Sequence, residues 1–402
     1  MFRRALSNEI VFWRALTILL GVFAYLKGAR LPTLYIATEA QLNYDHGLVK
    51  RGLFGAFWKA FHVPIHHYAV FAVVSYGLLA VLIVALILFI RRAHLFADEV
   101  NVLACAVFFS SYAFTYIGHL VGRMDILLMT ATLLVLTIEN PWRRNAVLLV
   151  VGPLCVLLHE MFVLTFLPLC VLPSVLNALE KRRLKDGALE ALLFAVPVAA
   201  TWVATFALAW LPAISGDQAA QIQADIVGRI DFPVGSHPWK LIRQSAVMTL
   251  ALMLGWALPA YNPIAWFISA FIFLPPIIFL TLLACNMLRA SNDPHPRWGA
   301  AAIVATIAVP ALMNVLGTDL HRWHTFCVFN AFGAVGIVMM RSRSRTRATS
   351  PHWRNGAILV IALNLLAGGA LMDYYKDAPY PYHDHIESGF KALHERHLPA
   401  PH

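Results

Sequence analysis

Residues 67–90 read HYAVFAVVSYGLLAVLIVALILFI, a run without Asp, Glu, Lys or Arg. A helix needs about 20 apolar residues to cross about 30 Å of hydrocarbon, so this run is long enough to span a bilayer. Further apolar runs recur along the chain, at 9–27, 99–118, 126–139, 145–158, 161–178, 187–211, 264–287, 299–316, 324–340 and 355–374. The sequence therefore predicts an all-α polytopic membrane protein with about eleven transmembrane helices.

The composition supports this class. Of the 402 residues, 60% are hydrophobic and 13% are charged, which lies far outside the range of soluble globular domains. We expect one transmembrane domain over residues 1–374, with two long outer loops at 28–66 and 212–263, followed by a histidine-containing tail at 375–402. The apolar stretch 245–260 is predicted to be a re-entrant or interfacial helix, because a full span there would put the later polar turns on the opposite face from the earlier ones.

Basic residues mark the connections that we assign to the cytoplasm. They occur at Arg3-Arg4, Arg91-Arg92, Arg143-Arg144, Lys181-Arg182-Arg183-Lys185, Arg289, Arg297, Arg341, Arg343, Arg345, Arg347 and Arg354. By the positive-inside rule, the amino terminus is cytoplasmic and the alternate loops face the periplasm of a bacterial inner membrane. The net charge of +10 then reflects topology and contact with anionic membrane lipids, and gives little support for a nucleic-acid partner.

The first outer loop contains a carboxylate close to two cations. Asp45, next to His46, precedes Lys50 and Arg51 by five and six positions. A carboxylate can accept the proton of an attacking hydroxyl, while fixed cations stabilise a phosphate leaving group. The alternative is a solvated loop whose Lys-Arg pair binds lipid headgroups.

Two short breaks between spans carry ionisable pairs. Arg123 and Asp125 lie where one span ends and the next begins, and they either clasp each other or face a polar cavity. His159 and Glu160 interrupt a long apolar stretch, where charge is costly and ionisable residues are functional candidates. The alternative for this second pair is a solvated helix end.

The densest polar cluster is Thr318-Asp319-Leu320-His321-Arg322-Trp323-His324. The guanidinium fork of Arg322 matches two phosphate oxygens, and an indole can stack on a sugar face or anchor the interface. The alternative is an aromatic-belt turn with incidental charges. The tail histidines match no closed metal site, so we expect adventitious metal binding there, and the five cysteines show no paired spacing.

The chain resembles the GT-C superfamily of polytopic glycosyltransferases in the number of its spans and in its polar residues at outer span ends. The resemblance implies that Asp45 is the catalytic base, and that four cations contact the donor phosphate: Lys50, Arg51, Arg123 and Arg322. It implies a sugar and acceptor pocket made of His46, Asp125, His159, Glu160, Asp319, His321, Trp323 and His324. The sequence departs from the paired-acid motif of many members, although Glu39 lies six residues before Asp45. No cofactor is assigned, and a divalent metal is left open.

The predicted function is thus an inner-membrane glycosyltransferase or glycan polymerase for envelope polysaccharide or glycolipid. Its partners would be a polyprenyl-phosphate-linked sugar donor, a glycan or lipid acceptor and membrane lipids. Two alternatives are a transporter or flippase of a lipid-linked or anionic solute, and an acyltransferase that modifies a sugar. Charges stacked through the bilayer would favour transport, whereas charges gathered at one surface favour catalysis.

Overall fold

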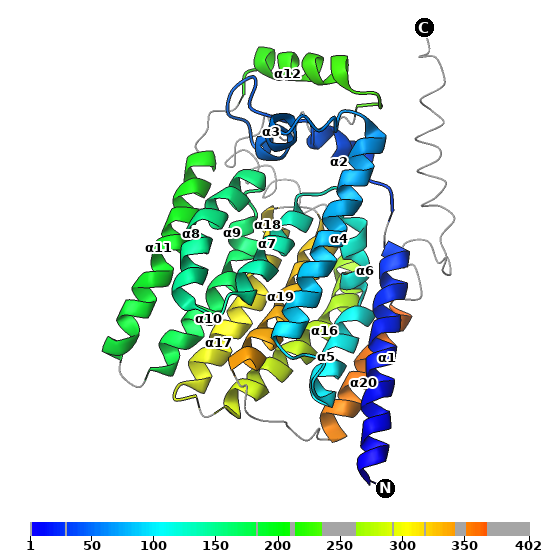
Figure 1. Ribbon diagram of the computed structural model, residues 1–402, viewed down its shortest axis with the longest axis vertical. Helices are drawn as coiled ribbons and strands as arrows, with labels where there is room; N and C mark the ends of the chain where they lie inside the picture. Colours follow the sequence, from blue (N-terminus) through cyan, green and yellow to red (C-terminus); the bar gives the residue numbers. More distant parts are fainter. Residues whose placement is uncertain are drawn as a thin grey trace.

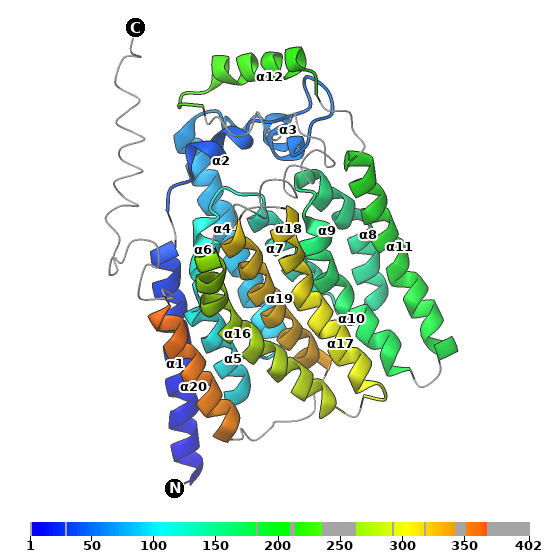
Figure 2. The same ribbon diagram turned by 180° about the vertical axis from the view of Figure 1, so that it is seen from behind.

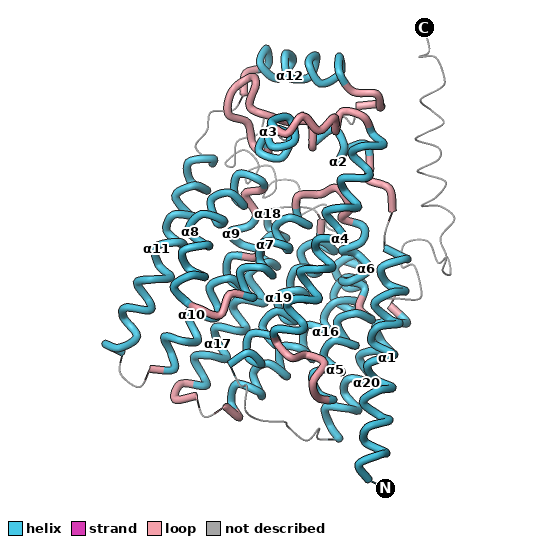
Figure 3. Tube along the Cα trace, in the orientation of Figure 1, coloured by secondary structure: helices cyan, strands magenta, loops and turns pink. Residues whose placement is uncertain are grey.

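The computed structural model describes residues 2–28, 30–181, 184–209, 214–234, 263–291, 293–316, 319–341 and 351–367. Every regular element in these ranges is a helix, which confirms the all-α prediction (Figure 3). The predicted helix at 245–260 and the tail at 375–402 lie outside the described residues.

Most helices run side by side in one bundle, and three others lie across one end of it (Figure 1). The bundle contains α1 (Phe2–Gly28), α4 (Tyr68–Arg92), α5 (Glu99–Ser110), α6 (Tyr112–His119), α7 (Asp125–Thr137), α8 (Pro141–Leu158), α9 (Phe162–Thr165), α10 (Leu167–Glu180), α11 (Leu184–Ala209), α16 (Pro263–Arg289), α17 (Pro296–Ala308), η2 (Val309–Leu312), α18 (Met313–Leu316), α19 (Leu320–Arg341) and α20 (Pro351–Leu366). The helices across its end are α2 (Leu34–Glu39), α3 (Gly52–Ala60) and α12 (Gly216–Arg229), which we call the cap layer.

Five helices among the described residues are long and apolar enough to cross a membrane. They are Glu9–Gly28, Tyr68–Arg92, Pro141–Leu158, Phe271–Arg289 and Leu320–Arg341. A sixth span would come from α5 and α6 together, which meet at an angle of 51°. These helices fit an α-helical, multi-pass membrane protein, while the expected total of about eleven spans stays a prediction.

Helix α19 forms the centre of the bundle. Phe332 on this helix stacks on Phe108 of α5, with ring centroids 4.3 Å apart and planes at 10°. On peripheral helices the apolar side chains turn outward instead, as Val73 on α4 and Val203 on α11 do with 72% and 66% exposure. An apolar surface of this kind is suited to lipid contact.

Asn330 of α19 binds backbone carbonyls at two helix breaks in the interior of the bundle. Its Nδ2 donates to the carbonyl of Thr165, where α9 ends, and to the carbonyl of Thr306 in α17. Pro310 has no N–H to offer the Thr306 carbonyl four residues earlier, so the break would otherwise leave that oxygen unsatisfied. The buried Asn330 therefore replaces a missing backbone donor in the interior of the bundle.

The basic residues that the structure describes at the cytoplasmic connections, such as Arg92, Arg341 and Arg354, lie at the bundle end opposite the cap layer. Three ion pairs tie them together: Arg92 to Glu139, Arg341 to Glu180 at 3.0 Å, and Arg354 to Glu9 at 2.5 Å. The last pair joins α20 to α1, which Figure 2 shows next to each other from behind. This arrangement agrees with the positive-inside pattern, and the assignment of this end to the cytoplasm stays a prediction.

Candidate functional site

Ionisable side chains from both loops and helices meet directly beneath the cap layer. The site lies where α8 ends and where α7 and α19 begin, at the cap end of the bundle (Figure 1). We call it the charged cluster, and it consists of Glu39, Lys50, Arg51, Arg123, Asp125, His159, Glu160, Asp319 and Arg322.

An ion pair between α7 and α19 forms the deepest part of the charged cluster. The Arg322 Nη2 donates to both carboxylate oxygens of Asp125, at 2.7 and 2.6 Å. Arg322 is 8% exposed and Asp125 is 1% exposed, and the guanidinium also lies over the Trp323 ring. Two charges this deep are tolerated because each neutralises the other. The Nε of Arg322 is buried without a hydrogen-bond partner.

His159 connects this pair to the cap layer. It follows α8 in an extended conformation that turns its ring back into the charged cluster. Its Nε2 lies 3.2 Å from Arg322 Nη2, and its Nδ1 lies 3.4 Å from the backbone nitrogen of Met161 and 3.5 Å from Glu160 Oε2. Burial and then the charge of Arg51 lower the pKa of His159, so the imidazole is neutral at pH 7.

Arg51 holds two acidic side chains together. Its Nη1 donates to Glu39 at 2.5 Å and its Nη2 donates to Glu160 at 3.0 Å. Arg51 has a φ of 61°, a left-handed conformation that is costly for a residue with a side chain. Strained residues of this kind concentrate at functional sites. The two ion pairs give a physical reason why arginine is held in this conformation, directly before α3.

The pKa values of the two Arg51 partners show how strongly they are held as carboxylates. Burial, the largest single effect, would raise the pKa of Glu39 and of Glu160, but the charges of Arg51 and His159 and the hydrogen bonds from Arg51 together outweigh it. The pKa of Glu39 is therefore lowered, and that of Glu160 lies well below its usual value. Both groups stay ionised at neutral pH.

A looser group of polar side chains lies next to the buried pair. Arg123 is 3.7 Å from Asp319, and Tyr116 of α6 donates to the same carboxylate at 3.0 Å. The side chains of Arg123 and Asp319 are 25% and 34% exposed, so both are accessible from the cap side. Arg123 also lies over the ring of Tyr35, 5.9 Å from its centroid.

Charges in the cluster balance. The four cations Lys50, Arg51, Arg123 and Arg322 meet the four carboxylates Glu39, Asp125, Glu160 and Asp319. An incoming phosphate therefore has to compete with a carboxylate for any cation it binds. The long Arg123 contact is the easiest to replace, because a 3.7 Å separation is an ion pair without a close hydrogen bond.

The structure thus brings together eight of the residues singled out from the sequence. It includes all four expected phosphate ligands and places Asp125, His159, Glu160 and Asp319 among them. It does not bring in Asp45 or His46, which lie in the cap layer. Asp45 binds Lys59 at 2.5 Å, and His46 is 3.6 Å from Asp225 of α12.

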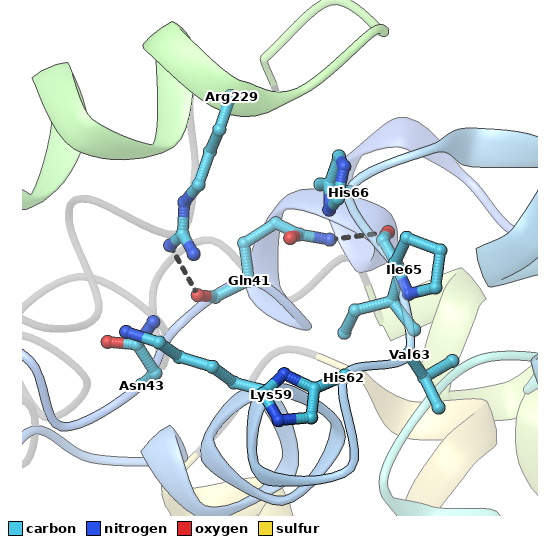
Figure 4. Close-up of a pocket in the computed structure, with 10 residues that line it drawn as sticks. Gln41, Asn43, Lys59, His62, Val63, Ile65, His66 and Arg229 are labelled. Atoms are coloured by element: carbon cyan, nitrogen blue, oxygen red, sulfur yellow. Dashed lines mark hydrogen bonds between the residues drawn. The ribbon is translucent and has the colours of Figure 1, made fainter.

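Asp45 instead lies near a separate cavity of about 260 Å³ within the cap layer. Lys59, its ion-pair partner, lines this cavity with Asn43, His62 and Arg229 (Figure 4). Arg229 reaches down from α12 and donates to the backbone carbonyl of Gln41 at 3.3 Å. A reaction that used Asp45 would have to take place next to this cavity, away from the charged cluster.

The remaining expected pocket residues on α19 point into the bundle. Trp323 is 3% exposed and offers no free ring face, which differs from the expected sugar-stacking role. His324 is bonded to Ser269 of α16, and His321 packs edge-on against Tyr112 of α6. Successive residues of a helix point in different directions, so these neighbours of Arg322 contact other helices.

Sequence reasoning gave no role to Glu39, Tyr35 or Tyr116. Tyr35 and Glu39 are four residues apart, which places both on one face of α2. That spacing, with a carboxylate in an otherwise apolar stretch, is the signal that could have identified them. For Tyr116, which lies in α6 far along the chain from Asp319, the sequence contains no comparable signal.

No group of three or more His, Cys, Asp or Glu side chains that could hold a metal ion occurs within the described parts of the chain. The tail histidines lie outside them. No family model, curated protein or solved structure matches this chain.

Proposed function

We propose that this protein is an integral membrane glycosyltransferase that uses a polyprenyl-phosphate-linked sugar at the periplasmic face of a bacterial inner membrane. The observation that carries the proposal is the meeting of four cations and four carboxylates at one end of an apolar bundle. A lipid-linked donor is amphipathic, so its chain stays in the bilayer while its phosphate meets cations at the interface. The acceptor would be a glycan or a lipid.

In the proposed reaction, an acceptor hydroxyl attacks the anomeric carbon while the bond from that carbon to the phosphate oxygen breaks. The hydroxyl proton passes to a carboxylate, and the negative charge left on the phosphate is stabilised by cations. Arg123 and Lys50 are the proposed phosphate ligands, because Arg51 and Arg322 are each held by close carboxylates. No metal is needed to write these steps.

For the base, the geometry favours Asp319 over Asp45. Asp319 is accessible and lies next to Arg123, whereas Asp45 lies in the cap layer and pairs with Lys59. Glu160 is equally accessible, but the charge of Arg51 lowers its pKa so far that it is a weak proton acceptor.

The location of the charges supports this proposal over transport. The ion pairs of the described residues lie at the two ends of the bundle, and Asn330, which is neutral, occupies its interior. A translocation path would need binding groups near the midplane. The acyltransferase alternative would require a polar path by which an acyl donor reaches the charged cluster from the bundle end opposite the cap layer. The contacts of the described residues do not support such a path.

The test uses proteoliposomes containing a panel of undecaprenyl-phosphate-linked sugars and measures the release of undecaprenyl phosphate. We expect Asp319→Asn to lower turnover by about 10²-fold or more, the usual contribution of a general base. Asp45→Asn is the matched carboxylate control and should stay within about threefold. The reverse pattern would return the base to Asp45, and no release from any donor by the unaltered protein would refute the proposed function.

A further inference from the structure

A large apolar groove separates α1 from α4. Helix α1 packs on α5 and α6, and α4 packs on α7, so the two helices flank a space rather than each other. The space has a volume of about 1010 Å³, and Phe109 and Phe114 form its floor. Both flanking helices are candidate membrane spans, so in a bilayer the groove opens toward lipid.

The walls of the groove are apolar and open. Ile18 on α1 is 59% exposed, and Val84 on α4 is 55% exposed. Exposed aliphatic walls over an aromatic floor are suited to a hydrocarbon chain and offer little to a polar solute. On α4 the wall extends from Ala80 to Arg91. At 1.5 Å per residue this is about 16 Å, close to half of a 30 Å hydrocarbon core. The groove therefore fits a chain of one leaflet.

The end of the groove away from the cap layer is basic. Arg91 and His94 line it there, and both side chains are exposed. Arg92, the neighbouring residue, is bound to Glu139, whereas Arg91 forms no ion pair within the described residues. An accessible cation at the mouth of an apolar groove complements a lipid with an anionic headgroup.

The turn that carries His94 is fixed from the other side of the groove. Arg14 of α1 donates from Nη2 and Nε to the carbonyl of Phe96, at 2.6 and 3.0 Å. The N–H of His94 donates to the carbonyl of Arg91 at 3.2 Å. The backbone that carries both basic residues is thus fixed at the groove mouth.

We propose that an anionic phospholipid of the leaflet opposite the cap layer binds in this groove. One acyl chain lies between α1 and α4 on the two phenylalanine rings, and the phosphate binds Arg91 and His94. The site lies at the far end of the bundle from the charged cluster, and the proposal does not depend on the glycosyltransferase function.

The test measures lipid retention by native mass spectrometry, after purification of the full chain into mixed micelles containing equal amounts of phosphatidylglycerol and phosphatidylcholine. Arg91→Gln removes the headgroup contact, and Arg143→Gln is the matched control, an exposed arginine of α8 outside the groove. Gly21→Leu fills the groove, because a Cβ at Gly21 meets the Phe109 ring at an ordinary 3.5 Å. Val73→Leu, on the lipid-facing side of α4, is its control.

We expect the unaltered protein to retain phosphatidylglycerol in preference to phosphatidylcholine. Arg91→Gln should weaken that preference by about fivefold, the effect of one basic residue near a membrane surface. Gly21→Leu should reduce the retention of both lipids while its thermal stability is kept. The proposal is overturned if Arg91→Gln behaves like Arg143→Gln, or if Gly21→Leu behaves like Val73→Leu.

Discussion

Replacing Asp125 by leucine should strongly destabilise the protein, because it removes the partner of a buried cation. Arg322 is 8% exposed, and its two hydrogen bonds to Asp125 would be lost together. Breaking a buried ion pair from one side costs about 3–5 kcal/mol. We expect a loss near the lower limit, about 3 kcal/mol, because Arg322 keeps its contact with His159 and its position over Trp323. That loss corresponds to roughly a 100-fold change in the unfolding equilibrium.

The second variant, Asp125→Leu with Arg322→Met, removes both charges. Replacing a buried pair by apolar residues of similar size is often neutral, so the double variant should recover most of the lost stability. The free energy of unfolding is to be measured by steric trapping in bicelles. The unaltered protein, the single variants Asp125→Leu and Arg322→Met, and the double variant form a double-mutant cycle. Arg354→Met is the control, since its ion pair with Glu9 is partly exposed and should contribute at most about 1 kcal/mol.

Two results would refute the reasoning. A loss below about 1 kcal/mol for Asp125→Leu would mean that water or lipid headgroups compensate Arg322 at this depth. A double variant as unstable as the sum of the two single variants would mean that the pair is not energetically coupled.

Three further outcomes are expected from the contacts. Asn330→Leu should lower the free energy of unfolding by about 1–3 kcal/mol, because two buried carbonyls lose their donor. The same steric-trap measurement tests this, and a smaller loss would contradict it. The Glu160 ion pair should stabilise the protein fully above pH 4.5, and this stabilisation should be lost as the pH falls below that value through the lowered pKa of Glu160. In thermal unfolding from pH 7 to pH 3, the Glu160→Gln variant should therefore lose less stability than the unaltered protein, and the same pH dependence for both proteins would contradict the prediction. Gly336→Ala should lower the free energy of unfolding by about 1–3 kcal/mol, because the added Cβ would come within 2.3 Å of the buried Phe89 ring. Gly77→Ala, where no atom lies within 4 Å of the added Cβ, should raise the free energy of unfolding by about 0.5–1 kcal/mol in the same assay.

The apolar runs were sufficient to predict the helical fold. A helix satisfies its own backbone hydrogen bonds, and a run such as 67–90 therefore predicts α4 without reference to any other part of the chain. The expected break at His159 and Glu160 is confirmed, since α8 ends at Leu158 and α9 begins at Phe162. The second break, at Phe166 between α9 and α10, was not predicted, because the Asn330 side chain that binds the Thr165 carbonyl there comes from α19.

Most residues of the charged cluster could also be identified from the sequence, because each is an ionisable residue next to an apolar run. An ionisable residue next to a span is expensive unless it is paired, so Arg123, His159, Glu160 and Arg322 could be picked out singly. Their partners could not, because the pairing of Arg322 with Asp125 joins residues 197 positions apart. Proximity in sequence placed Asp45, as the expected base, in one site with Lys50 and Arg51.

The tertiary structure gives Arg51 other acidic partners than Asp45. Arg51 adopts a left-handed backbone and turns away from Asp45, toward Glu39 on α2 and Glu160 after α8. The length of the apolar runs and the positions of the basic residues between them predicted the helices and their ends, because both are local properties of the chain. Which carboxylate neutralises which cation depended on the packing of distant helices, because only packing sets the distance across which two buried charges attract each other.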